Sequence, residues 1–195
     1  MSAAESPWPA RVVTGILERL AETVPRTAGT RVLAIDGRSG AGKTTLSAAV
    51  AAALRPRPPI VHLEDIYPGW DGLAASTGRL LDWVLDPLAR GEPARLRRYD
   101  WNRDEYADWV EIPVTPVLIV EGVGCGVSRC APYLSLLVYL DAPEPVRFAR
   151  AMTRDGEGYR RHWKRWAEQE RRQLAEGDPR GNADLIIDAQ PPGVG

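Results

Sequence analysis

Residues 32–46 of the chain read VLAIDGRSGAGKTTL. A short apolar run comes first, a glycine-rich turn follows, and an alanine-rich helical pattern begins at Lys43. Gly37, Gly42, Lys43 and Thr44 fill the pattern G-x-x-x-x-G-K-[ST], in the strand, loop and helix setting that this pattern requires. The stretch therefore predicts a phosphate-binding loop.

The residue types of this loop suit the oxygens of a nucleoside triphosphate. Glycines let successive backbone N–H groups point inward, because a positive φ costs them little. The helix that begins near Lys43 adds the positive end of its dipole. Lys43 can reach the outer phosphates, and the Thr44 hydroxyl can ligate Mg²⁺. The expected phosphate-binding residues are Gly37, Ser39, Gly40, Ala41, Gly42, Lys43, Thr44 and Thr45.

Length and composition favour one ordinary globular domain. The chain has 195 residues, of which 44% are hydrophobic and 26% charged, and its formal net charge is −1. We expect a single domain over residues 1–195, with an N-terminal helix within residues 1–25. The charge balance shows no basic footprint for nucleic acid. No apolar run approaches the ~20 residues that span a bilayer, so we expect no membrane partner.

Two further features favour a cytoplasmic protein. Residues 1–9 lack the basic and apolar regions of a secretion signal. Cys125 and Cys130 do not have the spacing of a zinc knuckle or a redox pair, and we interpret them as buried or idle reduced thiols.

Apolar patterns place helices and strands along the rest of the chain. Helical spacing is expected over residues 8–24, 44–54 and 77–90. The expected strands cover residues 31–36, 60–63, 116–120, 136–141 and 183–188. This alternation predicts an α/β fold of three layers, with a five-stranded parallel sheet flanked by helices and right-handed crossovers. Residues 93–98 are interpreted as an irregular basic stretch and residues 99–103 as a loop.

Acidic residues follow two of the expected strands. Glu64 and Asp65 come directly after the strand at 60–63, and Glu121 closes the strand at 116–120. The carboxyl ends of parallel strands form the ligand crevice of an open sheet, so all three should lie beside the phosphate loop. Glu121 is expected to be an outer-shell partner of Mg²⁺. A solvated acidic turn is the alternative for Glu64 and Asp65, and His62 is interpreted as a packed strand residue.

Arginines gather between residues 147 and 165. Arg147, Arg150 and Arg154 lie on one helical face, and Arg160 and Arg161 follow. Closing guanidinium groups neutralise the charge that develops during phosphoryl transfer, and they exclude water. We interpret this segment as a mobile arginine-bearing lid, with a solvated basic helix face as the alternative.

The helix after these arginines has two expected faces. Trp163 and Trp166 should pack the helix onto the body of the protein. Surface charges paired with Arg171 and Arg172 are expected at Glu168, Glu170 and Glu176.

One cluster can be read in two ways. Tyr99, Asp100 and Trp101 can stack on a planar ligand and bind its polar edge, or they can pack a loop onto the core. The sequence leaves both readings open.

From residue 31 to 188, the chain resembles the uridine kinase and phosphoribulokinase-like branch of P-loop kinases. The resemblance is carried by residues 37–44, 64–67, 99–101, 120–122 and 150–155, and residues 67–73 also resemble uncharacterised bacterial uridine-kinase-like ATP-binding proteins. It implies the P-loop NTPase fold, ATP and Mg²⁺ as cofactors, and a hydroxyl acceptor. It assigns the general base to Glu64, although the family has Asp there, and Asp65 remains the alternative. The family's histidine after its Tyr-Asp-Phe motif is missing, because Asn102, Arg103 and Asp104 follow here.

We therefore expect a kinase that moves the γ-phosphate of ATP to a hydroxyl of a small molecule or nucleoside-like acceptor. The alternatives are a nucleotide-dependent switch or accessory ATPase that acts on a protein partner, and a nucleoside monophosphate kinase. The choice of ATP over GTP and the oligomeric state, with a homodimer as one alternative, stay open. The expected catalytic residues are Lys43, Glu64, Asp65, Arg150 and Arg154; the acceptor-site residues Tyr67, Asp71, Tyr99, Asp100, Arg160 and Arg161; and the metal-site residues Thr44 and Glu121.

Overall fold

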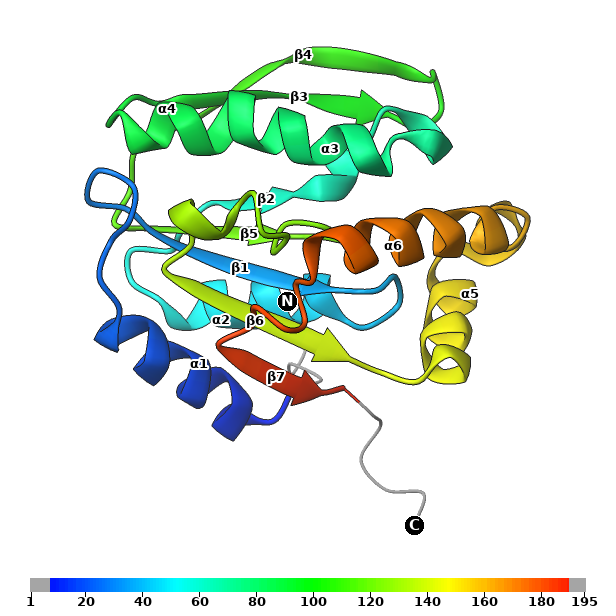
Figure 1. Cartoon of the computed structure of the whole chain (residues 1–195), viewed down its shortest axis with the longest axis horizontal. Helices are drawn as coiled ribbons and strands as arrows, with labels where there is room; N and C mark the ends of the chain where they lie inside the picture. Colours follow the sequence, from blue (N-terminus) through cyan, green and yellow to red (C-terminus); the bar gives the residue numbers. More distant parts are fainter. Residues whose placement is uncertain (1–7, 190–195) are drawn as a thin grey trace, which may run out of the picture.

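A five-stranded parallel sheet forms the centre of the computed structural model, which describes residues 8–189 (Figure 1). The five-stranded parallel sheet predicted from the sequence is confirmed. Residues 1–7 and 190–195, which the single-domain prediction includes, lie outside the described part. Across the sheet the order is β2 (Ile60–His62), β5 (Val117–Glu121), β1 (Arg31–Gly37), β6 (Leu136–Asp141) and β7 (Leu185–Asp188).

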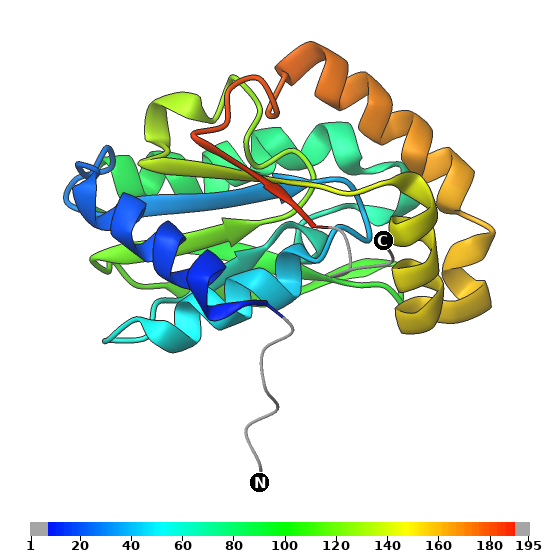
Figure 2. The same cartoon turned by 90° about the horizontal axis from the view of Figure 1, so that it is seen from below.

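Helices cover both faces of the sheet, because alternate residues of the central strand point to opposite sides. In β1, Val32 and Ala34 pack into one apolar cluster and Leu33 and Ile35 into the other. Figures 1 and 2 show α1 (Ala10–Glu22) and α2 (Lys43–Ala53) on the second side. The first side carries α3 (Leu73–Leu80), the π-helical turn η3 (Leu81–Leu85), α4 (Asp86–Ala89) and α6 (Trp163–Gly177). The three-layer α/β prediction is therefore confirmed.

Short connections complete the chain. The 3₁₀ turns η1 (Leu63–Asp65) and η2 (Gly69–Asp71) follow β2, and η4 (Ala131–Tyr133) precedes β6. Helix α5 (Glu144–Arg160) follows β6, and its regular geometry is interrupted at Gly156, where φ is 64°.

Within residues 8–189, none of the helices combines the length and the apolar content of a membrane span. Cys125 and Cys130 are free and buried.

An antiparallel hairpin replaces the irregular stretch expected at residues 93–103. Strands β3 (Ala94–Asp100) and β4 (Glu105–Ile112) pair with each other and lie beyond α3 and α4 (Figure 1). Ala94 and Leu96 are buried, whereas Arg95 points to solvent. This period-two alternation is a strand signal, and the high arginine content of the stretch obscured it.

Candidate active site

The phosphate loop connects β1 to α2 in the way that its sequence predicts. Gly37 and Gly40 have φ of 140° and 80°, and their neighbours leave no room for a side chain. A Cβ at Gly37 would lie 2.5 Å from the Leu140 oxygen, and one at Gly40 would lie 2.2 Å from the Arg147 oxygen. The Lys43 ammonium donates to the carbonyl oxygens of Gly37, at 2.7 Å, and of Arg38, at 3.2 Å.

A small cavity of about 50 Å³ lies directly on this loop. Of the expected phosphate-binding residues, Ser39, Gly40, Lys43 and Thr44 line it. Thr45 is exposed on the first turn of α2, where its hydroxyl donates to the Gly42 oxygen. The remaining lining residues are Glu64, Tyr67, Glu121, Gly122, Val123 and Arg154.

Thr44 and Glu121 meet inside this small cavity, as the strand order requires. The Thr44 hydroxyl donates to Glu121 Oε1 at 3.0 Å, and His62 Nδ1 lies 2.6 Å from the same oxygen. Burial raises the pKa of Glu121, but the hydrogen bond to His62 and the charge of Lys43 lower it more, and the net shift is downward. The same hydrogen bond raises the pKa of His62. His62 is a partly buried strand residue, as the sequence predicts, and its ring also contacts Glu121 of the site.

The oxygens of Thr44 and Glu121 are suited to Mg²⁺, which prefers hard ligands and keeps several waters and phosphate oxygens. Within residues 8–189, no group of three His, Cys, Asp or Glu side chains could hold a metal by itself. A cation here would therefore depend on the nucleotide for further ligands. The two oxygens are consistent with a magnesium ion that also binds the phosphates of a nucleotide.

Glu64 and Asp65 lie in η1, at the carboxyl end of β2 and beside the phosphate loop. Glu64 is exposed overall, yet the partial burial of its carboxylate raises its pKa, and the charge of Glu121 adds to this shift. Arg154 acts in the opposite direction. The pKa of Asp65 is also raised by burial, but Arg98 Nε lies 3.5 Å from its Oδ2 and partly offsets the shift.

A larger cavity of about 540 Å³ adjoins the small one. It lies between the turns after β2, the tip of the hairpin, and helices α5 and α6. Ser39, Glu64, Tyr67 and Arg154 line both cavities. The other residues that line the larger cavity are Asp65, Trp70, Trp101, Asn102, Asp155, Gly158, Tyr159 and Trp166.

Three residues expected in the acceptor site lie elsewhere. Asp71 forms an ion pair with Arg165 outside the cavity lining. Tyr99 donates its hydroxyl to Asp104, within the hairpin. Asp100 accepts the N–H groups of residues 102 and 103, at 2.9 and 3.1 Å, and so stabilises the turn of the hairpin.

The arginines of the expected lid have four different environments. Arg147 is 3% exposed and donates to the oxygens of Ala142, at 3.0 Å, and Ser39, at 3.1 Å, so it is a fixed support and not a lid residue. Arg150 donates to the Ala41 oxygen at 3.3 Å, which places it behind the phosphate loop. Arg154 lines both cavities and forms a two-fold contact with Asp155. Neither cavity is lined by Arg160, which pairs with Glu157, or by the exposed Arg161.

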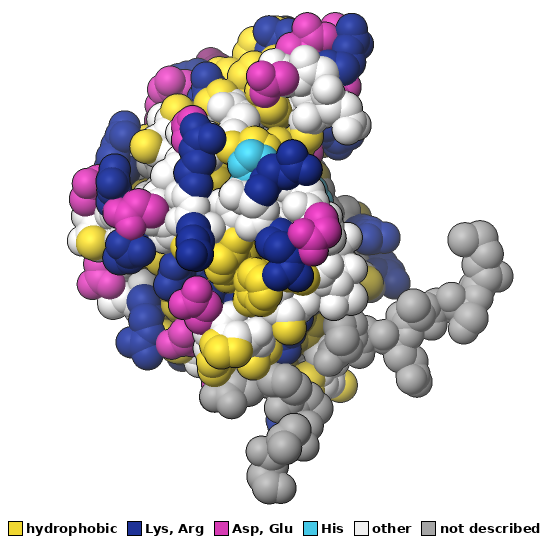
Figure 3. Space-filling model, turned by 90° about the vertical axis from the view of Figure 1, so that its right-hand side faces the viewer, with side chains coloured by type: hydrophobic (Ala, Val, Ile, Leu, Met, Phe, Trp, Pro, Cys, Tyr) yellow, Lys and Arg dark blue, Asp and Glu magenta, His cyan; other side chains and the backbone are white. Residues whose placement is uncertain are grey.

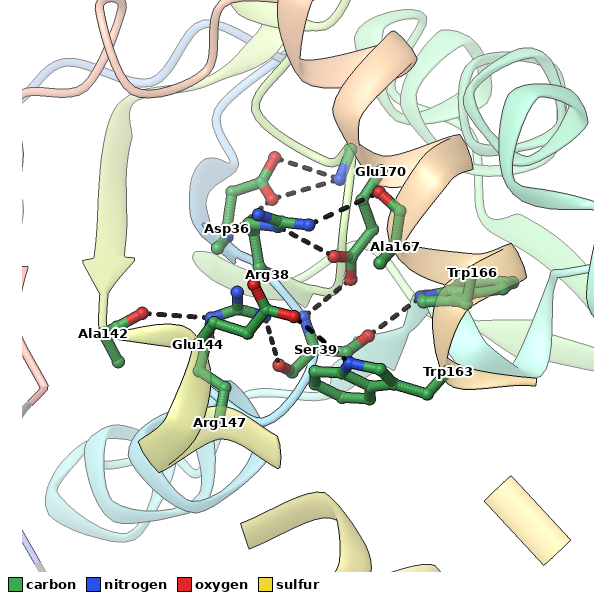
Figure 4. Close-up of polar contacts among 12 residues, drawn as sticks. Asp36, Arg38, Ser39, Ala142, Glu144, Arg147, Trp163, Trp166, Ala167 and Glu170 are labelled. Atoms are coloured by element: carbon green, nitrogen blue, oxygen red, sulfur yellow. Dashed lines mark hydrogen bonds and ion pairs between the residues drawn. The ribbon is translucent and has the colours of Figure 1, made fainter. Parts of the chain in front are cut away.

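Helix α6 holds the phosphate loop through a buried carboxylate that sequence reasoning missed. Glu170 is 1% exposed and accepts the Ser39 N–H at 2.7 Å and Arg38 Nε at 2.9 Å (Figure 4). Trp166 Nε1 donates to the Ser39 hydroxyl at 2.9 Å. The prediction of a surface charge at Glu170 is wrong, whereas Glu168 does pair with Arg171 and Arg172 on the surface.

A second buried acid, Asp36, braces the loop from the sheet side. It accepts the N–H groups of Gly37, Gly124 and Gly126, the first at 2.6 Å and the last at 2.8 Å. Burial raises its pKa to about 6, although these donors and Lys43 oppose the shift. Asp36 therefore ties the phosphate loop to the loop that follows β5.

The outer face that α5 and α6 form carries side chains of both charges. Figure 3 shows that basic, acidic and apolar side chains are interspersed on the face that α5 and α6 form.

Comparisons with known proteins found one family profile and several similar structures. The profile of the Phosphoribulokinase / Uridine kinase family matches residues 69–163. A possible uridine kinase from Bacillus stearothermophilus superposes with a TM-score of 0.65 at 23% identity, over 90% of this chain and 97% of that one. A candidate fructose transport system kinase from Silicibacter sp. TM1040 gives a TM-score of 0.57 at 22% identity, over 91% and 98%. No curated protein matches the chain.

These two structural similarities show the fold, and the family match supports a nucleotide-binding kinase. Together they confirm the resemblance to uridine-kinase-like P-loop kinases that the sequence indicates.

Proposed function

We propose that the chain transfers the γ-phosphate of ATP to a hydroxyl group of a small molecule. One observation carries this proposal: the cavity on the phosphate loop and the larger cavity share Ser39, Glu64, Tyr67 and Arg154. A nucleotide on the loop would thus direct its terminal phosphate at whatever fills the larger cavity. Positioning of this kind supplies most of the catalysis in phosphoryl transfer.

The nucleotide side is formed by residues 37–45. Backbone N–H groups and Lys43 would hold the phosphates. Thr44 would hold Mg²⁺ directly and Glu121 through water, and the bound cation supplies charge neutralisation at the phosphates. Arg150 supports the loop from behind through the Ala41 oxygen.

On the acceptor side, Glu64 is the general base in this proposal. Its raised pKa favours proton uptake from a hydroxyl, and it lines both cavities. Asp65 lines only the larger cavity and faces Arg98. Arg154 is the arginine placed to neutralise charge on the transferred group. A single domain over residues 1–195, a cytoplasmic location and a mobile lid that begins after the fixed Arg147 remain parts of the proposal.

ADP release with Mg-ATP tests this function. We would compare the rate without an acceptor and with nucleosides, ribosyl vitamins, pantothenate, aminoglycosides and simple sugars. The proposal expects at least one acceptor to raise the rate strongly, and Lys43→Ala to lose that increase. If the protein binds ATP and no acceptor changes a slow rate, the result favours a nucleotide-dependent switch that acts on a protein partner.

A further inference from the structure

The larger cavity has a curved aromatic wall. Trp70 and Trp101 lie 4.9 Å apart between ring centroids at 58°, and Trp70 and Trp166 lie 6.3 Å apart at 90°. Tyr67 meets Trp166 edge-on at 63°. Rings at such steep angles do not form the parallel plates that sandwich a flat heterocycle. They surround a compact group on several sides instead.

Tyr159 is the member of this wall that lies most nearly parallel to Trp70, at 28° and 5.4 Å. The two rings stack on each other, so these faces are already used. The His162 ring also stacks on Trp70, at 4.1 Å and 7°. The indole of Trp70 is therefore held firmly by its neighbours, and the wall is formed before any ligand binds.

The charges in the cavity are mainly negative. Glu64, Asp65 and Asp155 line it, whereas Arg154 is the one basic residue of the described lining, and Arg98 pairs with Asp65 from outside that lining. Arg154 is engaged by Asp155 through Nε and Nη2, at distances of 2.7 to 3.0 Å. Arg154 also serves the transferred phosphoryl group in the proposed function, so the described lining provides no further cation for an acceptor that carries a phosphate or a carboxylate.

Aromatic faces and carboxylates share one kind of ligand, a positively charged nitrogen. The negative face of an indole attracts a cation electrostatically, and the attraction grows when water is excluded. We propose that the acceptor is an alcohol bearing a protonated amine or a quaternary ammonium group. The charged nitrogen lies against the rings of Trp101 and Trp166, and the hydroxyl lies toward Glu64. The phosphorylation of that hydroxyl rests on the proposed function, whereas the binding of the cation does not.

Equilibrium binding to the full chain without nucleotide tests this inference. Isothermal titration would compare two matched pairs of probes: choline with its neutral isostere 3,3-dimethylbutan-1-ol, and glucosamine with glucose. We expect the cation of at least one pair to bind about tenfold or more tightly than its neutral counterpart. The inference is overturned if neither pair shows a preference, which includes the case in which no probe binds.

Two variants locate the preference. Trp101 lies at the hairpin tip and is 38% exposed, so Trp101→Leu leaves the core intact, and it should remove the preference for the cation. Trp109 lies on β4, is 49% exposed and does not line the cavity, so Trp109→Leu is the matched control and should keep the preference. If both variants lose the preference for the cation equally, the cation does not bind in this cavity.

Phosphate transfer to the preferred cation separates this inference from the proposed function. If the cation binds in the Trp101-dependent way and no acceptor, cationic or neutral, is phosphorylated, the kinase proposal fails and the binding site stands. If neutral alcohols are phosphorylated as well as their cationic counterparts, the kinase proposal stands and the inference on the acceptor fails.

Discussion

The buried contact between α6 and the phosphate loop gives a sharp prediction for Glu170→Gln. Glutamine has nearly the same shape and keeps one oxygen that can accept the Ser39 N–H. Its amide nitrogen, however, would face Arg38 Nε, which now donates to the carboxylate at 2.9 Å. The change therefore removes one charge-assisted hydrogen bond. It also leaves the N–H of Arg38 facing the N–H of the new amide.

The magnitude follows from the burial of the two partners. A hydrogen bond to a charged group contributes about 1.5–3 kcal/mol. Glu170 is almost fully buried, but the Arg38 side chain is 29% exposed and can regain water. We therefore expect the lower end of the range, about 1.5 kcal/mol, in the free energy of unfolding. If nucleotide binding must also reorder the loosened loop, the affinity for Mg-ATP should fall by about tenfold.

Urea denaturation and calorimetric titration with Mg-ATP measure the two effects separately. Glu168→Gln is the matched control, because Glu168 lies on the same helix with its two arginine partners at the surface. Exposed ion pairs contribute little, so this variant should match the parent protein in both assays. The reasoning is refuted if Glu170→Gln behaves like Glu168→Gln. An unchanged Mg-ATP affinity in a destabilised Glu170→Gln protein would refute the loop-positioning role alone.

Three further predictions concern the site itself. Lys43→Ala should abolish phosphate transfer in a protein whose circular dichroism is unchanged. Glu64→Gln should lower the transfer rate by about 10²-fold or more with Mg-ATP affinity nearly unchanged; full activity would move the base to Asp65. For Asp36, the folded pKa of about 6 exceeds the ordinary 3.8, so the folded state holds this proton more tightly. Its contribution to stability is then largest below pH 4 and falls by about 3 kcal/mol as the pH rises through 6. Urea denaturation at pH 4 and pH 7 should show that Asp36→Asn lacks this pH-dependent part of the free energy of unfolding. Equal pH dependence in the parent protein and the variant would contradict the raised pKa of Asp36.

The parts of the site that the sequence predicts are those set by local pattern and strand order. The phosphate loop needs only a strand, a glycine turn and a helix in succession, and residues 32–46 contain all three. Glu121 and Glu64 were placed beside the loop because parallel strands end at the same edge of the sheet. The register agrees, since His62 pairs with Glu121 and Glu121 pairs with Ile35.

The predictions that the structure corrects concern residues whose position depends on which face of a helix or strand meets the core. Trp163, Trp166 and Glu170 are spaced i, i+3, i+7 and share one helical face. This shared face accounts for the burial of Glu170, which the charge pattern of the helix alone does not predict. Tyr99 and Asp100 could not be placed, because their direction depends on the hairpin that the arginine-rich sequence obscured.

The wall of the larger cavity could not be predicted from any one segment. Trp70 comes from η2, Trp101 from the hairpin and Trp166 from α6, and only tertiary packing brings them together. A tryptophan in isolation is more often a core residue than a ligand contact. The sequence therefore predicts the nucleotide side of the site better than the acceptor side.

The most direct test of the central claim does not require the acceptor to be known. The purified protein would be incubated with Mg-ATP and a small-molecule extract of bacterial cells, and the products would be compared by mass spectrometry with those of Lys43→Ala. The account predicts at least one hydroxyl compound that gains the mass of a phosphoryl group with the parent protein and not with the variant. No such compound, from protein shown to bind ATP, would contradict a small-molecule kinase.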